Sequence, residues 1–585
     1  MIKILNTTQI RDADAYTILQ EPISSIQLME RAANAFVQQF LQDFPNTDKP
    51  IIVICGNGNN GGDGLAIARL LQKKGHNVTV FTFPSKHFSS DYLYQLKNYE
   101  KIENCTVFNT NDTTFIQKIN KTYHYDYLHI GTAFAFVSYE PTGVNMAIHA
   151  FLLRLMVLLV PSYSYAETSV SDLATSINTV WLMTAAALVF LMQAGFSLVE
   201  GGMARSKNTV NVIMKNYMDC CIGGIIFWLV GFGLMFGANP SGWFGTDLFM
   251  LSDASPWDFS FLLFQMMFAA TATTIVSGAM AERARYSAYL IGACVITGFI
   301  YPVFGSWAWG AYSAGSGWLK ELGFIDFAGS TVVHSLGGWC ALAGIMVLGS
   351  RLGRFGSDGS SRTIAGHNLS LVALGGFILW FGWFGFNGGS TLVGDASIGK
   401  IILNTHLAAC AGAAGVALFS WLLNRPMLLT STVNGSLGGL VAITAGCASM
   451  DVQFAVLTGF IAGGVTLIGS HLLNRYRLDD VVDAVTVHGF CGAWGTLAAG
   501  LFYAGDLFNG HRVLVQCIGI GAAFVWGFGL SWLMYTVIDK AIGLRASPLH
   551  EQRGLDYTEH AEIGYPEFQQ NKLFNSENLA SRGEL

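Results

Sequence analysis

Residues 326–339 read Asp-Phe-Ala-Gly-Ser-Thr-Val-Val-His-Ser-Leu-Gly-Gly-Trp, and residues 480–494 read Asp-Val-Val-Asp-Ala-Val-Thr-Val-His-Gly-Phe-Cys-Gly-Ala-Trp. In both stretches a histidine follows an aspartate by eight residues, and a glycine follows the histidine by four. Each stretch also opens a long apolar run, where ionisable side chains are costly and therefore point to function. The repeated pattern predicts two related intramembrane histidines, His334 and His488.

The composition around these stretches is that of a membrane protein. Hydrophobic residues make up 52% of the 585-residue chain and charged residues only 12%, against about 25% charged in an ordinary soluble domain. The net charge of -6 and the lack of a long basic stripe argue against a nucleic-acid partner. No paired CxxC spacing among the 10 cysteines suggests a zinc site.

The apolar runs after Glu167 predict an all-α polytopic membrane protein with about eleven transmembrane helices, since a span needs about 20 apolar residues. The expected spans are 179–198, 218–238, 259–280, 286–309, 327–349, 368–388, 401–423, 430–447, 453–472, 484–504 and 513–538.

Lysine and arginine in the short loops predict the orientation of these spans, because cytoplasmic loops carry the positive charge. With the N-terminus of the first span outside, the inner loops hold eleven cations and the outer loops only three. The inner cations are Arg205, Lys207, Lys215, Arg283, Arg285, Arg351, Arg354, Arg362, Arg425, Arg475 and Arg477, and the outer ones are Lys320, Lys400 and Arg512. The bias predicts an N-out, C-in topology.

The two histidine stretches lie five spans apart, so their spans run in opposite directions. This spacing predicts an inverted 5+5 repeat with a site near the bilayer midplane. A neutral imidazole donates at one ring nitrogen and accepts at the other. Two facing imidazoles that share a hydrogen bond would therefore suit a small neutral amine, and would also allow proton transfer.

Aromatic side chains gather near the predicted pore. Phe264 and Phe268 are four residues apart and share a helical face, and Trp309 ends a span on the outer side, where its ring would attract an ammonium-type cation. With Gly278-Ala-Met-Ala-Glu-Arg, Trp383-Phe-Gly-Phe-Asn and the tail strings Gly543-Leu-Arg and Arg553-Gly-Leu-Asp, these motifs resemble the ammonium transporters of the Amt type, in the Amt/Rh superfamily.

The resemblance implies a role for each matching residue. Ammonium would be recruited by Trp309, Phe264 and Ser390, pass a gate of Phe268 and Phe386, and enter a pore of twin histidines, His334 and His488, supported by Asp326, Trp383 and Asp480. The stretch 311–325 is longer than usual for the family, which leaves Trp307 and Trp318 as alternatives to Trp309.

The resemblance also implies the setting of transport. The substrate would be ammonium or ammonia, with no cofactor for transport. The protein would be a homotrimer in a bacterial-type inner (cell) membrane, with a PII-type regulatory protein on its cytoplasmic face. An ammonium sensor built on the same body is an alternative. Such sensors usually carry an output domain after the last span, and residues 541–585 form a short cytoplasmic tail without one.

The first 130 residues are polar and follow a different pattern. The apolar run 51–55 predicts a buried parallel strand, residues 56–64 a glycine-rich loop, residues 65–74 a helix that Gly75 ends, and residues 78–81 a second strand. Glycines in such a loop let a phosphate approach the backbone and the helix N-terminus. We therefore expect a partial α/β, Rossmann-like segment.

The loop string of this segment resembles the N-terminal half of NAD(P)H-hydrate epimerases. The resemblance assigns Asn59, Asn60, Gly61, Gly62 and Asp63 to the nucleotide and gives Asn60 a potassium ion. The catalytic aspartate of that family has no counterpart among residues 1–145. We expect a truncated, inactive segment, with a bifunctional fusion as the alternative. Potassium and NAD(P)H hydrate would be ligands only of an active domain.

A short segment joins the two parts. Residues 146–166 contain a methionine, one arginine, an apolar stretch and a Ser-Tyr-Ala end, which is typical of a secretory signal peptide. The pattern predicts a membrane domain over residues 167–540, which begins outside after cleavage of the signal.

Overall fold

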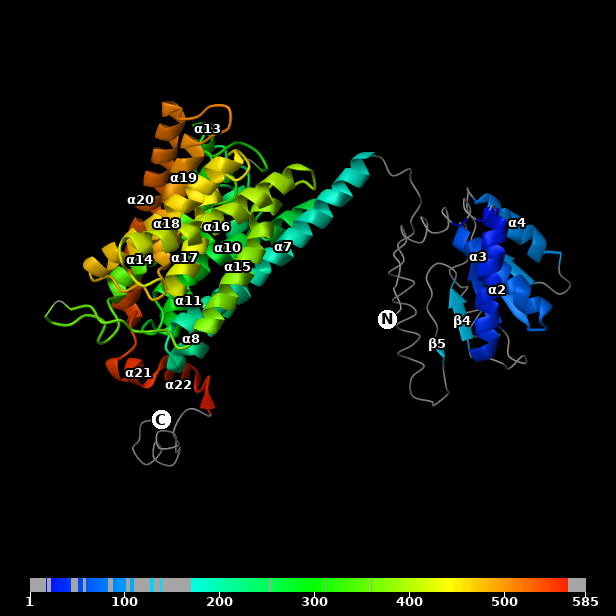
Figure 1. Cartoon of the computed structure of the whole chain (residues 1–585), viewed down its shortest axis with the longest axis horizontal. Coiled ribbons are helices and arrows are strands. Elements are labelled where there is room, and N and C mark those ends of the chain that lie inside the picture. Colours follow the sequence, from blue (N-terminus) through cyan, green and yellow to red (C-terminus); the bar gives the residue numbers. More distant parts are fainter. Residues whose placement is uncertain are drawn as a thin grey trace. The chain divides into compact units, whose positions relative to one another are not determined.

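The computed structural model describes residues 17, 21, 23–43, 51–55, 59–82, 88–101, 106–109, 127–130 and 137–138, and then 170–566 apart from 252–253, 311 and 359. The chain divides into two compact units, Met1–Ser164 and Tyr165–Leu585. Figure 1 shows a small α/β unit and a large helical bundle. The signal-peptide prediction for residues 146–166 lies outside the described residues.

The N-terminal unit is built on a five-stranded sheet in the order β3-β2-β1-β4-β5. Its strands are β1 (Ile51–Cys55), β2 (Val78–Thr82), β3 (Thr106–Asn109), β4 (Tyr127–Ile130) and β5 (Val137–Ser138). The first four pair in parallel, and β5 pairs antiparallel with β4. The sequence analysis did not expect β4, although it lies directly beside the central strand β1.

The helices of this unit are α2 (Ser25–Asp43), α3 (Asn59–Lys73) and α4 (Ser90–Tyr99). Helix α3 begins at Asn59, so the prediction of a loop up to residue 64 was wrong. Close packing of the first turns of α3 explains why glycines occupy positions 62 and 64. A Cβ at Gly62 would lie 3.1 Å from the Met29 side chain, and one at Gly64 would lie 2.9 Å from Cys55 Sγ.

The C-terminal unit holds nine helical segments long and apolar enough to cross a membrane, counted within the described residues. They are Leu173–Met203, Ser206–Phe236, Pro256–Ala279, Tyr286–Trp309, Ser330–Leu348, Leu369–Gly389, Ser397–Leu422, Val452–Arg475 and Gly510–Ile542. The two other predicted spans coincide with shorter helical segments, Leu429–Ile443 and the stretch that begins at Val485 and ends at Leu501.

The elements of this unit are α7 (Val170–Met203), η1 (Ser206–Asn208), α8 (Thr209–Ile226), η2 (Phe227–Gly231), α9 (Phe232–Phe236), α10 (Pro256–Ala279), α11 (Tyr286–Val295), η3 (Ile296–Ile300), α12 (Tyr301–Trp309), α13 (Trp318–Glu321), η4 (Ser330–Ser335), α14 (Leu336–Leu348), α15 (Leu369–Gly389), α16 (Ser397–Leu422), α17 (Leu429–Ile443), α18 (Val452–Arg475), η5 (Val485–Phe490), α19 (Cys491–Leu501), α20 (Gly510–Ile542), α21 (Pro548–Arg553) and α22 (Leu555–His560). Figure 1 shows α13 at one end of the bundle and α21 and α22 at the other.

Charged loops meet at the end of the bundle that carries α21 and α22. Glu282 accepts hydrogen bonds from Arg205 and Arg351, and Asp479 binds Arg351 with N–O distances of 2.8 and 2.9 Å. The opposite end is held mostly by uncharged contacts, among them the indole of Trp309 on the carbonyl of Asp326 at 2.7 Å. The positively charged loops of the sequence therefore lie together at one end.

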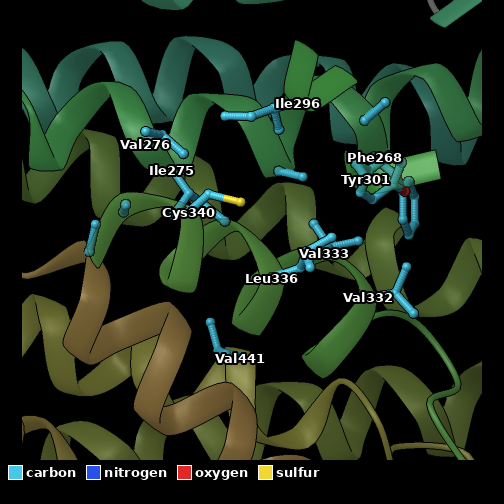
Figure 2. Close-up of a cluster of buried hydrophobic side chains, with 14 of the residues drawn as sticks. Phe268, Ile275, Val276, Ile296, Tyr301, Val332, Val333, Leu336, Cys340 and Val441 are labelled. Carbon is cyan, nitrogen blue, oxygen red and sulfur yellow. The ribbon is translucent and has the colours of Figure 1, made fainter. Parts of the chain in front are cut away.

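A continuous apolar core joins α10, η3, α12, η4, α14 and α17. Figure 2 shows part of it, where Ile275 of α10 lies near Cys340 of α14, and Val333 of η4 lies near Leu336 of α14. All four of these side chains are buried. The histidine of η4 is thus placed within a tightly packed helical interior.

Candidate functional site

The outer part of the site is aromatic and is carried by α10 and α15. The rings of Phe268 and Phe386 stack with centroids 4.0 Å apart, and Phe264 lies 4.6 Å from Phe268. All three rings are buried. Phe264 also packs against the end of α15, since a Cβ at Gly389 would lie 2.8 Å from its ring. These contacts gather three buried aromatic rings at the end of α15.

Trp309, of the three tryptophans considered from the sequence, is the one that lies at these rings. Its ring centroid is 6.3 Å from that of Phe268, and a Cβ at Gly329 would lie 3.2 Å from its indole. Trp307 and Trp318 instead pack against each other, at 5.6 Å. The half-buried Trp309 indole therefore borders the ring of Phe268.

Ser390 follows α15 directly and is half-buried. Its hydroxyl donates to the carbonyl of Phe386 at 2.8 Å. The contact ties the end of the helix to the backbone of Phe386, and the serine oxygen stays available as an acceptor.

The two histidines meet below the rings. Nδ1 of His334 lies 3.2 Å from Nδ1 of His488, and their ring centroids are 5.2 Å apart. His334 is fully buried and His488 is 5% exposed. Nε2 of His334 has no hydrogen-bond partner among the described residues. The pair therefore shares one hydrogen bond, and Nε2 of His334 is left without a partner in this part of the structure.

Matching local structures position the two rings. His334 lies in the π-helical turn η4, and His488 lies in the π-helical turn η5. Such turns are rare and occur often at functional sites. The two segments cross closely at Gly338. A Cβ added there would lie only 2.3 Å from the backbone nitrogen of Gly489. The repeated glycine of the sequence therefore serves the crossing of the two segments.

The two aspartates act as caps of the turns. The carboxylate of Asp326 accepts from the backbone N–H groups of Gly329, Thr331 and Val332 at 2.8–3.0 Å. Asp480 accepts in the same way from Val482 and Val485, at 3.3 and 2.7 Å. Charged acceptors at helix N-termini are stabilising, so both aspartates stabilise the backbone at the start of their π-helical turns.

Trp383 forms the wall beside the histidines. Its ring stacks on His334 with centroids 4.9 Å apart, and its indole donates to the Thr444 hydroxyl at 2.9 Å. His334 is also stacked on Phe386, at 5.3 Å. The imidazole therefore packs against both aromatic rings, whose own centroids are 5.7 Å apart.

The sequence analysis missed the inner side of the site. Phe196 lies 6.1 Å from His488, and both line a cavity of about 20 Å³ with the buried Glu200. The predicted first span ended at residue 198, two residues before this carboxylate. The signal that would have found it is an acidic side chain in the last turn of an apolar helix.

The nucleotide-loop residues of the N-terminal unit lie at the start of α3. Gly61 and Gly62 are buried and Asp63 is partly exposed. The side chains of Asn59 and Asn60 lie outside the described residues, and so does the predicted potassium site. No group of three metal-ligating His, Cys, Asp or Glu side chains occurs among the residues that the structure describes.

Comparison with known proteins assigns both units. Residues 180–565 match the model of the Ammonium Transporter Family, and residues 25–134 match that of the YjeF-related protein N-terminus. Ammonium transporter Amt2 of Archaeoglobus fulgidus is 43% identical over 432 residues, which cover 69% of this chain and 91% of the relative.

Solved structures give the same result for the fold. A structure titled Sensor Amt Protein matches with a TM-score of 0.65 and 41% identity, over 67% of this chain and 100% of its own. Mep2 of Saccharomyces cerevisiae matches with a TM-score of 0.59 and 26% identity, over 64% of this chain and 88% of its own. The chain is a multi-pass membrane protein that belongs to the ammonium transporter family and transports ammonium.

Proposed function

We propose that ammonium crosses this transporter through the aromatic gate and the histidine pair. NH4+ is recruited at Trp309, Phe264 and Ser390, loses its proton near the gate, and passes His334 and His488 as NH3. The observation that carries the proposal is the shared Nδ1–Nδ1 contact of 3.2 Å in a buried apolar setting, with Nε2 of His334 left without a partner.

Desolvation explains the selectivity of such a route. Potassium needs a ring of carbonyl oxygens to replace its hydration shell, and the stacked faces of Phe268, Phe386 and Trp383 provide none. Ammonium differs because it can give up a proton. The pore is therefore selective for the one cation that becomes neutral.

The mutation of the two histidines tests the route. Purified protein in liposomes would be given an ammonium gradient, and uptake and charge movement would be measured for His334→Ala and His488→Ala. Both variants are expected to lose proton coupling and selectivity over potassium by at least about tenfold, which is about 1.4 kcal/mol. Unchanged selectivity and coupling in both would remove the histidines from the mechanism.

The membrane topology is part of the proposal. Eleven crossings, an outer N-terminus and an inner C-terminus agree with the alternation of charged loops, and the pair of π-helical turns supports an inverted 5+5 repeat. Cysteine labelling at Ser241, on the proposed outer side, and at Ser360, on the proposed inner side, would test it in intact cells. Equal accessibility of both would contradict it.

The assembly and the setting follow from the family resemblance. The protein is a homotrimer in a bacterial-type inner membrane, its signal-like segment 146–166 is removed, and a PII-type protein docks at the cytoplasmic face. The contacts of α21 with charged side chains support such a docking face, because Lys207 donates to the carbonyl of Glu551 and Arg545 donates to its carboxylate. The mass of the purified complex tests whether the protein is a homotrimer. The N-terminal sequence of the purified protein tests whether the segment 146–166 is removed.

The N-terminal unit is an inert extension in this proposal, because residues 1–145 lack a counterpart of the epimerase catalytic aspartate. An epimerase assay on the full chain with hydrated NADPH would refute this if it showed turnover. The sensor alternative is favoured by the likeness to a structure titled Sensor Amt Protein. Ammonium binding without uptake in liposomes would support it over transport.

A further inference from the structure

The inner face of His488 opens on a small cavity that Glu200 also lines. Its other walls are mostly apolar, with Phe196, Ile275 and Leu437 among them. The cavity measures about 20 Å³, and about 10–15 Å³ of this measure is enough for one water molecule. A single water therefore fits between the imidazole and the carboxyl group.

Glu200 is an unusual group for this position. It is 2% exposed, and its Oε2 has no hydrogen-bond partner among the described residues. A buried carboxylate oxygen without a protein partner is costly. Since Glu200 also lines the cavity, this unpaired oxygen can accept a hydrogen bond from a water molecule there.

A second buried group leads away from the cavity. Lys215 of α8 is fully buried, interacts electrostatically with Glu200, and its Nζ has no hydrogen-bond partner in the described part of the chain. One turn earlier, Asn211 contacts His560 of α22 at 2.9 Å. These polar side chains form a path from the cavity toward the end of the bundle that carries the tail.

We propose that Glu200 is a proton-transfer residue at the inner end of the pore. The inference rests on the proposed route through the histidines. The proton that NH4+ loses near the gate reaches a ring nitrogen of His488, which becomes an imidazolium. The imidazolium then gives this proton to the cavity water, and the water gives one of its own protons to Glu200 Oε2. The imidazolium becomes neutral and the carboxylate becomes a carboxylic acid. NH3 that emerges from the pore then takes this proton, so NH4+ forms and the carboxylate is restored.

The experiment measures charge movement in liposomes after a jump in ammonium chloride, with uptake measured in parallel. Glu200→Gln keeps the size of the side chain but accepts no proton, and is expected to lower the current at least tenfold. Glu200→Asp keeps a carboxyl group that the water still reaches, and is expected within about threefold of the unmodified protein.

Asp219→Asn is the matched control. Asp219 is a buried carboxylate that interacts electrostatically with Glu200, but Tyr289 donates to its Oδ2 at 2.6 Å, and it does not line the cavity. Its neutralisation is expected to change the current less than twofold. A Glu200→Gln current within twofold of the unmodified protein, an equal loss in Asp219→Asn, or an unmodified protein that carries no current would each overturn the inference.

The histidine variants separate this inference from the proposed route. Coupling lost in His488→Ala but kept in Glu200→Gln overturns only the role of Glu200, whereas coupling kept in both histidine variants overturns the route itself. If Glu200→Gln does not fold, the unmodified protein is measured in D2O. The current is expected to fall about twofold, and an unchanged current overturns the proton transfer.

Discussion

The two histidine segments are built alike but are held in place by different chemistry. Each is a π-helical turn capped by an aspartate eight residues before its histidine. The loop before η4 is held by uncharged hydrogen bonds. Gln516 accepts from the N–H of Ile325 and donates to its carbonyl, at 2.8 and 2.7 Å.

The loop before η5 is held by ions instead. Asp479 is 2% exposed and binds both Arg351 and Arg354, and Arg351 also binds Glu282. The two copies of the repeat therefore share the position of the histidine but differ in the interactions that hold the loop before it. The end with neutral bonds carries Trp309 and the aromatic rings beside it, and the end with ions carries the tail.

The largest expected effect breaks the contact that both segments share. In Gly338→Leu the new Cβ would lie 2.3 Å from the backbone of Gly489, which cannot move aside without displacing η5. We expect almost no folded protein in detergent extracts, measured by size-exclusion profile. Gly521→Leu on α20 is the control, because nothing lies within 4 Å of the Cβ position there. Similar yields of the two variants would contradict the close crossing.

The next largest loss of stability is expected when the ion pairs that hold the loop before η5 are broken. Arg351→Met leaves Asp479 and Glu282 buried without this partner, and breaking a buried pair costs about 3–5 kcal/mol. We expect a large fall in melting temperature in detergent, with His488 displaced. Arg362→Met removes an exposed charge from the same loop and is expected to melt like the unmodified protein. A small shift in Arg351→Met would show that the ions do not hold η5.

A smaller loss of stability is expected when the uncharged hydrogen bonds that hold the loop before η4 are removed. Gln516→Leu leaves the N–H and carbonyl of Ile325 without this side chain, and an unpaired buried group costs about 1–3 kcal/mol. The melting temperature should fall less than in Arg351→Met, and the effect should not depend on salt. Cys517→Leu, at an exposed position of the same helix, is the control. A fall in the melting temperature of Gln516→Leu that depends on salt would contradict the difference between the uncharged loop before η4 and the ionic loop before η5.

The membrane architecture was readable from the sequence because lipid imposes a simple rule. Apolar runs of about 20 residues are spans, and all nine long helices overlap predicted ones. The two histidines and their aspartates were found because their spacing repeats. The sequence could not give the π-helical turns, because these arise from the crossing of η4 and η5 and not from local propensity.

Two misses have physical causes. Helix α3 begins at Asn59 although its first turn is rich in glycine, because Gly62 and Gly64 pack against α2 and β1, and this outweighs low helix propensity. Glu200 was missed because hydropathy windows end a span at its last apolar residue, whereas α7 continues to Met203. Tertiary packing decides both positions.

The smallest expected effect sharpens the contrast through pH. Burial alone raises the pKa of Asp479, but hydrogen bonds from Arg351 and the charges of Arg283 and Arg351 outweigh it and hold that pKa well below its usual value. A depressed folded pKa adds stability above the unfolded pKa of about 3.9, and this stability is lost as the pH falls below it. The melting temperatures of the unmodified protein and Asp479→Asn should therefore differ at pH 6, and the difference should begin to narrow as the pH falls below about 4. Asp451→Asn is the control, because its partner Lys400 is 45% exposed and exposed pairs contribute about 0–1 kcal/mol. A gap for Asp479→Asn that stays constant from pH 6 to pH 3 would mean that its carboxylate does not supply the ionic hold on the loop before η5.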